Sequence, residues 1–246
     1  MKMITSRTNQ TVKFIRSLKD KKNRDEAGLY IVEGAKMVKE ALNFNVGVQT
    51  VILTPKTADN FSDLACETFV VSEDVFKSMS DEVTPQGVMA LVKKPIIEIS
   101  SPNGTCLFLD GVKDPSNVGA IIRTACACGI EEIYLADGAD AYAPKSVRAS
   151  MSGIFGVKVF SGTREDLLNV IGCPLVIADM KGENVFTTNL SGKICIVVGS
   201  EAHGVSQEIK DKAQYVVSIP MTDRIESLNA AVSAGIIMYC LNKPKI

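Results

Sequence analysis

The chain has 246 residues, which suits one large domain or two modest ones whose core needs no disulfide or metal support. Hydrophobic residues make up 46% and charged residues 22% of the sequence, as in ordinary globular proteins, and the net charge of −1 excludes a molecule that is basic over its whole surface. No apolar run is long enough to cross a membrane and no apolar leader opens the chain, so we expect a cytoplasmic protein without a membrane partner.

Seven cysteines and a single histidine limit the metal and hydrolase chemistry that the chain can carry. The cysteines show no zinc-ligand spacing, since Cys126 and Cys128 are too close together, and most of the others lie in apolar runs typical of buried reduced thiols. We therefore expect no metal site. A Ser–His–Asp hydrolase would depend on His203, for which an exposed loop position is the simpler interpretation. The glycine patterns of dinucleotide-binding oxidoreductases and P-loop NTPases are also missing.

Positive charge is concentrated at the start of the chain. Residues 1–24 contain eight lysines and arginines against a single acid, Asp20, which gives a local charge of +7. This pattern predicts one basic helix over residues 8–23. A solvated amphipathic helix accounts for it, and an arm that binds a phosphate-rich partner is the sharper hypothesis.

The remainder of the first hundred residues predicts a small α/β unit. Runs rich in β-branched residues predict strands, and the amphipathic stretches between them predict helices. The expected strands are Leu29–Glu33, Val48–Leu53, Thr68–Val71 and Val88–Val92, and the expected helices are Gly34–Asn43 and Val75–Met79. Within residues 93–104, the proline, serine, asparagine and glycine of the later part make it the best candidate for a linker.

From residue 105 onward, apolar strands alternate with helices, which predicts a parallel sheet covered on both faces. The expected strands are Thr105–Leu109, Glu132–Ala136, Val157–Phe160, Leu175–Ala178, Lys193–Val198 and Tyr215–Ile219. The expected helices are Val118–Cys128, Ser146–Met151, Arg164–Ile171, Gln207–Lys212 and Leu228–Leu241. Ligands in such sheets bind beyond the carboxyl ends of the strands, so the loops at these ends contain the candidate site residues.

The first of three notable loops follows the strand that ends at Leu109. Asp114, Ser116 and Asn117 are possible caps of the next helix. Farther along that helix, Arg123 lies beside Gly119 and Ala127 on a face of small residues. Such a face permits the close approach of another chain or element.

The second and third loops combine glycine, acid, serine and amide residues. The second reads Gly199-Ser-Glu201-Ala-His-Gly, in which glycine lets the backbone approach a ligand and the carboxylate can accept hydrogen bonds. In the third loop, the segment Ile-Pro-Met at residues 219–221 precedes the last helix. We expect Ser227 to be the N-cap of that helix, with Asn229 as an additional polar residue in its first turn.

Taken in this order, the three loops resemble the three motifs of the SpoU/TrmH class of SPOUT RNA methyltransferases. The matching segments are D-P-x-N-x-G-x-I-x-R-T-A, then G-x-E-x-x-G after an apolar strand, then I-P-M followed by E-S-L-N-x-A-V, and they span Asp110 to Gly235. The preceding region resembles, on the looser match Val32-Glu33-Gly34, the small ribosomal-protein-like RNA-binding domain that many members carry.

The resemblance implies an α/β fold with two domains. Residues 104–246 would form a parallel-sheet SPOUT methyltransferase domain with a deep trefoil knot, and residues 1–100 would form an α/β RNA substrate-binding domain. The implied activity is RNA 2′-O-ribose methylation with S-adenosyl-L-methionine as the cofactor. Ribosomal RNA of the large subunit is the favoured substrate, with transfer RNA as the alternative. A homodimer with sites near its interface is also implied, and the small-residue face beside Arg123 fits it.

The resemblance also implies the site residues. Six residues are expected to bind the cofactor, largely through their main-chain groups: Gly199, Ile219, Met221 and Leu228, with Leu135 and Ala136 as weaker additions. The candidate catalytic residues are Asn117, Arg123, Glu201, Ser227 and Asn229. A guanidinium keeps its proton far above neutral pH. We therefore expect Arg123 to stabilise charge on the reacting oxygen, or to hold a phosphate, and not to act as a free base.

The chain departs from the family motifs at three positions. Ser116 stands where glycine is common, Ser200 where asparagine usually precedes the glutamate, and Asp223 where a turn glycine is common. Ser200 could weaken the positioning of the ribose or of the first loop, whereas aspartate tolerates left-handed backbone better than most residues.

Two other classes of protein stay open. One is a non-catalytic RNA-binding or ribosome-assembly protein with the same fold, which a failure to bind S-adenosylmethionine would support. The other is an unrelated α/β transferase that acts on a small molecule, which an absence of RNA binding would support.

Overall fold

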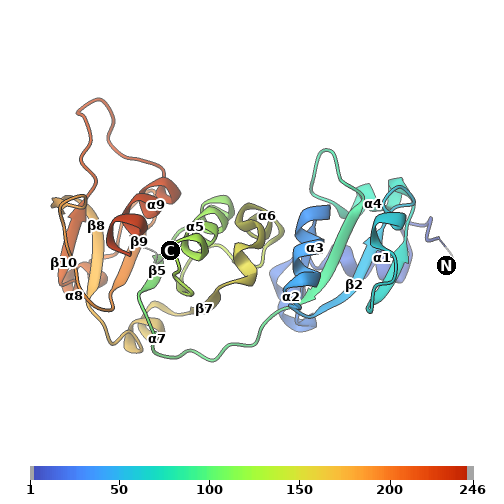
Figure 1. Ribbon diagram of the computed structural model, residues 1–246, viewed down its shortest axis with the longest axis horizontal. Coiled ribbons are helices and arrows are strands. Elements are labelled where there is room, and N and C mark those ends of the chain that lie inside the picture. Colours follow the sequence, from blue (N-terminus) through green and yellow to red (C-terminus); the bar gives the residue numbers. More distant parts are fainter. Residues whose placement is uncertain (1–2, 243–246) are drawn as a thin grey trace.

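The computed structural model describes residues 3–242, which contain two β-sheets joined by the coil segment 94–105 (Figure 1). The first sheet has four strands in the order β1-β4-β2-β3, and the second has six in the order β10-β8-β9-β5-β6-β7. The coil segment agrees with the predicted linker, and its Ile96 is fully exposed.

The first sheet separates two apolar layers. Its strands are β1 (Leu29–Glu33), β2 (Val48–Leu53), β3 (Glu67–Val70) and β4 (Val88–Lys93). Helix α3 (Ala35–Asn43) and the 3₁₀ helix η1 (Ala58–Phe61) pack on one face, and α1 (Gln10–Ser17) and α4 (Glu73–Met79) pack on the other. Successive strand residues point to opposite faces. Val51 and Leu53 therefore join the layer of α3, while Ile52 joins the layer of α1 and α4.

The prediction of one basic helix over residues 8–23 is wrong. The segment forms two helices, α1 (Gln10–Ser17) and α2 (Lys21–Ala27). Between them Asp20 is extended, and its carboxylate accepts a hydrogen bond of 2.9 Å from the Lys22 N–H, which caps α2. The single acid in this basic run is thus the residue that separates the helices.

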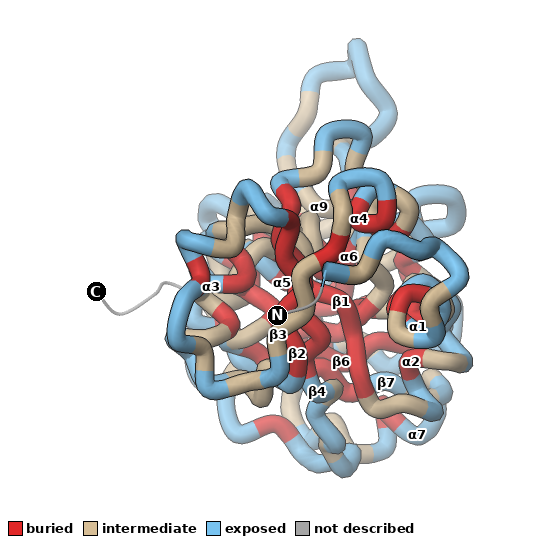
Figure 2. The backbone as a smooth tube through the Cα atoms, turned by 90° about the vertical axis from the view of Figure 1, so that its right-hand side faces the viewer, coloured by how far each residue is buried: buried red, intermediate tan, exposed pale blue. Residues whose placement is uncertain are grey.

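All strand pairs of the second sheet are parallel, as the alternation of strands and helices predicts. Its strands are β5 (Cys106–Asp110), β6 (Glu132–Ala136), β7 (Lys158–Gly162), β8 (Leu175–Asn184), β9 (Cys195–Gly199) and β10 (Tyr215–Ser218). In Figure 2 the buried residues gather in the central strands and the exposed residues form the outer loops. The predicted parallel α/β architecture is confirmed, and the trefoil knot stays a prediction.

Helices cover both faces of the second sheet. One face packs against α5 (Pro115–Ala127), α6 (Pro144–Ser150), the 3₁₀ helix η2 (Met151–Phe155) and α9 (Ala230–Leu241). The other packs against α7 (Arg164–Asn169) and α8 (Gln207–Lys212). No helix within residues 3–242 has both the length and the apolar composition that a membrane crossing requires.

The extent of β8 differs from the prediction. The strand was expected to end at Ala178, but it continues to Asn184. It pairs with β10 across a register shift between Val216 and Val217. The polar second half of β8 lacks the apolar pattern that marks a strand in the sequence, so only its pairing reveals it.

The two sheets are held against each other by a polar and aromatic interface. Arg24 of α2 is 2% exposed, and its guanidinium pairs with the Asp140 carboxylate at 2.7 Å. The Tyr30 and Tyr142 rings lie 5.0 Å apart between centroids. The Lys94 ammonium lies 5.3 Å from the centroid of the Tyr142 ring. Arg24, part of the basic run at the start of the chain, therefore serves the contact between the two sheets.

Candidate active site

The three loops predicted to form the site lie at one edge of the six-stranded sheet. They follow β5, β9 and β10, whose carboxyl ends share that edge because the strands are parallel. β5 and β9 are neighbours, with Asp110 opposite Gly199 in the register. Helix α5 begins after the first loop and is capped by Asp114, whose carboxylate accepts from the Ser116 N–H at 2.8 Å.

A chain of hydrogen bonds joins one polar residue from each loop. Asn117 Nδ2 donates to Glu201 Oε1 at 2.5 Å, and Asn229 Nδ2 donates to Asn117 Oδ1 at 3.0 Å. Asn229 Oδ1 accepts from the N–H groups of Ala231 and Val232 at the start of α9. Both ends of the Asn117 amide are therefore fixed, and the structure brings together three of the five candidate catalytic residues.

Asn229, and not Ser227, is the N-cap of α9, so the prediction made for Ser227 as a cap is wrong. Ser227 is exposed in the loop and lies outside the hydrogen-bonded chain. Serine and asparagine are comparable N-caps. The sequence alone therefore could not choose between them, whereas in the fold only Asn229 both caps the helix and reaches Asn117.

A tight turn shapes the second loop. Ser200 and Gly204 exchange main-chain hydrogen bonds of 3.0 and 2.9 Å. A Cβ atom at Gly199 would lie 2.1 Å from the Gly204 carbonyl carbon, so the turn excludes any side chain at position 199. Ser200 Oγ accepts from the His203 N–H at 3.2 Å. The serine that replaces the usual asparagine of the motif therefore stabilises the turn itself.

A buried carboxylate to which the sequence analysis gave no role links the loops. Asp110, 2% exposed at the end of β5, accepts from the Ser206 N–H and from Arg164 Nε, each at 2.7 Å. The hydrogen bond to Asp110 raises the pKa of the Arg164 guanidinium, which also contacts Asp137 at 3.0 Å. Asp110 thus links the carboxyl end of β5 to the starts of α7 and α8. The sequence could have singled out Asp110, because it is an acid at the end of an otherwise apolar strand.

Known proteins match the chain along nearly its whole length. Residues 104–239 match the SpoU rRNA Methylase family, and residues 9–90 match the MRM3-like substrate binding domain. The chain is 32% identical to the 23S rRNA (guanosine(2553)-2'-O)-methyltransferase RlmP of Bacillus subtilis, over 98% of this chain and 99% of that protein. The chain belongs to the SpoU rRNA methylase family.

Two solved structures extend the comparison to the fold of this SpoU methylase. The AdoMet-bound rRNA methyltransferase from Sinorhizobium meliloti has a TM-score of 0.85 and 29% identity, covering 97% of this chain and 96% of that one. The SpoU methyltransferase AviRb from Streptomyces viridochromogenes, in complex with AdoMet, has a TM-score of 0.84 and 25% identity, covering 94% and 96%. The similarity therefore includes both sheets, and the SPOUT class predicted for the fold is confirmed.

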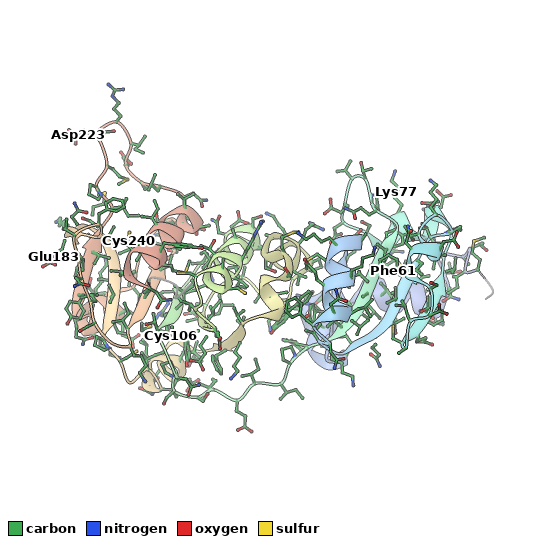
Figure 3. The ribbon with its side chains drawn as sticks, in the orientation of Figure 1. Phe61, Lys77, Cys106, Glu183, Asp223 and Cys240 are labelled. Carbon is green, nitrogen blue, oxygen red and sulfur yellow. The ribbon has the colours of Figure 1, made fainter. Side chains whose placement is uncertain are left out.

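Apart from Gly199 at the end of β9, the candidate cofactor residues of this SpoU methylase fall into two groups. Leu135 and Ala136 are buried at the end of β6, whereas Ile219, Met221 and Leu228 are half-buried in the loop between β10 and α9. Figure 1 shows this loop projecting from the body of the molecule, and Figure 3 labels Asp223 on it. No hydrogen bond within residues 3–242 joins the two groups.

Arg123 lies on the exposed side of α5, two turns beyond Asn117, with no hydrogen bond or ion pair from its side chain within the described residues. The close approach predicted beside it is made by the same chain. A Cβ atom at Gly119 would lie 2.3 Å from the Ser146 carbonyl oxygen, and one at Gly153 would lie 2.8 Å from Arg123 Cα. Because α6 and η2 occupy this face, it does not support a second subunit as the sequence analysis expected.

The remaining residues singled out in the sequence lie on the surface of these loops. His203 is exposed, as predicted. Asp223 is exposed and is not among the residues with left-handed backbone, so its position does not require the glycine that is common there. Within residues 3–242 no cluster of histidine, cysteine, aspartate and glutamate is arranged to bind a metal ion.

Proposed function

We propose that this SpoU-family protein transfers a methyl group from S-adenosylmethionine to the 2′-hydroxyl of a ribose in ribosomal RNA. The observation that carries the proposal is the hydrogen-bonded chain of Glu201, Asn117 and Asn229, one residue from each family motif. Relatives named for 23S rRNA, including the 23S rRNA (uridine(2479)-2'-O)-methyltransferase of Streptomyces viridochromogenes, favour the large ribosomal subunit over transfer RNA.

The loop between β10 and α9 has the properties that an adenosine-binding segment needs. Between Ile219 and Leu228 no main-chain group forms a main-chain hydrogen bond within the described residues, so donors and acceptors are available to a ligand. Ile219, Met221 and Leu228 add half-buried apolar surface for a purine ring. We assign cofactor binding to these residues with Gly199, Leu135 and Ala136. When bound, S-adenosylmethionine supplies an electrophilic methyl group on a good leaving group.

The chain's own residues would align the ribose hydroxyl and stabilise its charge. Asn117 is oriented by Glu201 and Asn229, and its remaining amide N–H can position the ribose. Ser227 is exposed two residues before Asn229, and it can contact the 2′-hydroxyl of the ribose. The positive charge of Arg123 can stabilise the alkoxide as the proton leaves. Arg123 could instead hold the neighbouring phosphate, which could itself accept the proton.

We assign RNA capture to residues 1–100 and methyl transfer to residues 104–246, with the trefoil knot in the second domain. The match of residues 9–90 to a substrate-binding domain and of residues 104–239 to the methylase family supports this division. The coil segment 94–105 between the two sheets also supports it. A protein that acts on ribosomal RNA is further expected to work in the cytoplasm.

A homodimer is part of the proposal, and α9 is its expected contact. This helix contains no charged residue, and it presents an apolar stripe to solvent: Val232 is 51% exposed, Tyr239 is 47% exposed, and Ile236 lies half-buried between them. A second copy of the chain would cover this stripe. Because α9 packs beside α5, a partner subunit there would also lie near Arg123.

Two measurements on the purified protein test the proposed function. Calorimetry should give one S-adenosylmethionine site per chain with no metal requirement. Transfer of a labelled methyl group to ribosomal RNA, followed by nuclease digestion, should yield a single 2′-O-methylated nucleoside. Absence of cofactor binding at millimolar concentration would favour a non-catalytic RNA-binding protein. Cofactor binding without any RNA binding would favour a small-molecule transferase.

A further inference from the structure

The structure divides the basic residues at the start of the chain into paired and unpaired side chains. Four of them contact carboxylates at distances between 2.5 and 3.8 Å: Lys19, Lys21, Lys22 and Arg24. Lys13 and Arg16 form no ion pair and no side-chain hydrogen bond within residues 3–242, and both are exposed on α1. Of the basic residues from Arg7 to Arg24, three therefore remain unpaired within residues 3–242: Arg7, which precedes α1, and Lys13 and Arg16 on α1 itself.

Lys13 and Arg16 line a hollow of about 370 Å³ between α1 and α4. Its other lining residues are Ser17, Lys19 and Ser78, none of which is an acid. The Lys19 ammonium is turned to the Asp81 carboxylate at 2.5 Å and to the Ser80 carbonyl oxygen at 3.2 Å. The hollow thus offers two uncompensated cations, one of which is an arginine whose planar fork matches the oxygens of a phosphate.

Helix α1 also carries an exposed aromatic ring next in sequence to Lys13. Phe14 follows Lys13 on α1 and is 42% exposed, although its neighbours Val12 and Ile15 are buried in the core. Unpaired bases of RNA stack on such rings, whereas a lone phosphate ion or a duplex makes no use of them. The combination of a free cation pair and an adjacent ring is therefore characteristic of a single-stranded or looped RNA segment.

We propose that the hollow between α1 and α4 binds a backbone phosphate of the RNA substrate, with Lys13 and Arg16 as ligands and Phe14 stacking on the adjacent base. This inference rests on the proposed function. Figure 3 labels Lys77 on α4 and Asp223 on the β10–α9 loop at opposite ends of the molecule. Within one subunit, RNA that contacts both the hollow and the β10–α9 loop spans the long axis, so we expect the substrate to be a structured RNA and not a short oligonucleotide.

The double variant Lys13→Gln/Arg16→Gln tests the proposal. We expect its affinity for a fragment of ribosomal RNA to fall about tenfold near 0.1 M salt, and the slope of log K against log salt to decrease by about two, because two phosphate contacts are lost. The matched control Lys36→Gln/Lys39→Gln removes the same charge at the same spacing from α3, on the opposite face of the sheet, and should leave the slope nearly unchanged.

Three further readouts separate binding from folding and chemistry. The melting temperature, the affinity for S-adenosylmethionine and the single-turnover rate at saturating RNA should match the wild-type values, since both side chains are exposed and distant from the site loops. Phe14→Leu should weaken binding to looped RNA more than binding to a duplex. A short oligonucleotide around the methylated nucleotide should bind the wild-type protein and the double variant equally.

The outcomes distinguish the inference from the function on which it rests. If wild-type protein methylates the RNA but the double variant binds it with unchanged affinity and slope, the hollow is not a phosphate site. An equal loss in the α3 control would mean diffuse attraction by surface charge, and it would overturn the inference in the same way. Failure of the wild-type protein to methylate any RNA would instead refute the proposed function, and the inference with it.

Discussion

Arg123 is the residue to which the proposal gives the most chemistry, and its exposed side chain forms no hydrogen bond or ion pair within the described residues. Arg123→Ala should therefore lower the single-turnover rate at saturating RNA about 10²–10³-fold, or about 3–4 kcal/mol of barrier, as for a lost oxyanion donor. The melting temperature and the calorimetric affinity for S-adenosylmethionine should barely change, because the exposed guanidinium supports neither the core nor the cofactor loop.

Arg123→Lys is the matched variant, since it keeps the charge and loses the planar fork. We expect it to restore little of the rate, because an ammonium cannot reproduce the paired donors. A near-normal rate for the alanine variant would remove Arg123 from the mechanism. A large loss of cofactor affinity would reassign it to cofactor binding.

The role of a residue could be predicted from the sequence where a family motif contains that residue. It could not be predicted where the role depends on a partner far away in the sequence. The order of the three motifs identified Asn117, Glu201 and Asn229, but not that they would form one hydrogen-bonded chain. Asp110 and Arg24 received no role because their partners, Arg164 and Asp140, lie 54 and 116 positions away. No local pattern predicts which of many surface charges a buried charge will meet.

At the scale of helices and strands, the periodicity of apolar residues predicted where most elements lie. The bounds of β1, β2, β6 and α8 agree residue for residue with those expected from the sequence. The errors occur where periodicity is uninformative: Asp20 interrupts a helix within a uniformly basic run, and the polar half of β8 is a strand only because β10 pairs with it.

The start of α9 gives a prediction that compares two neighbouring residues. Asn229→Ala removes the cap and the bond to Asn117, so the free energy of unfolding should fall by about 1 kcal/mol. The single-turnover rate should fall as well, because Asn117 loses one of its two supports. Ser227→Ala should change the stability by less than about 0.5 kcal/mol. Denaturant unfolding of both variants decides the matter, and equal destabilisation would contradict the assignment of Asn229 as the cap.

At the scale of the whole molecule, the buried pair of Arg24 and Asp140 joins the two sheets. Asp140→Asn removes the charge that faces Arg24 but keeps an oxygen for the Tyr142 N–H. Breaking this buried pair should lower the free energy of unfolding by about 3 kcal/mol. It should also speed proteolysis in the coil segment 94–105. Glu26→Gln, which alters only a surface pair at 3.8 Å, is the control. Unchanged proteolysis and stability in Asp140→Asn would mean that other contacts hold the two sheets together.

The measurement that tests ribosomal RNA ribose methylation most directly is a map of 2′-O-methylated positions in ribosomal RNA from cells with and without the gene. One position in the large-subunit RNA should lose its methyl group when the gene is removed. It should regain the group with the wild-type gene and stay unmethylated with the Arg123→Ala gene expressed at the same level. A map that is identical with and without the gene, in ribosomal and transfer RNA alike, would contradict the proposed activity.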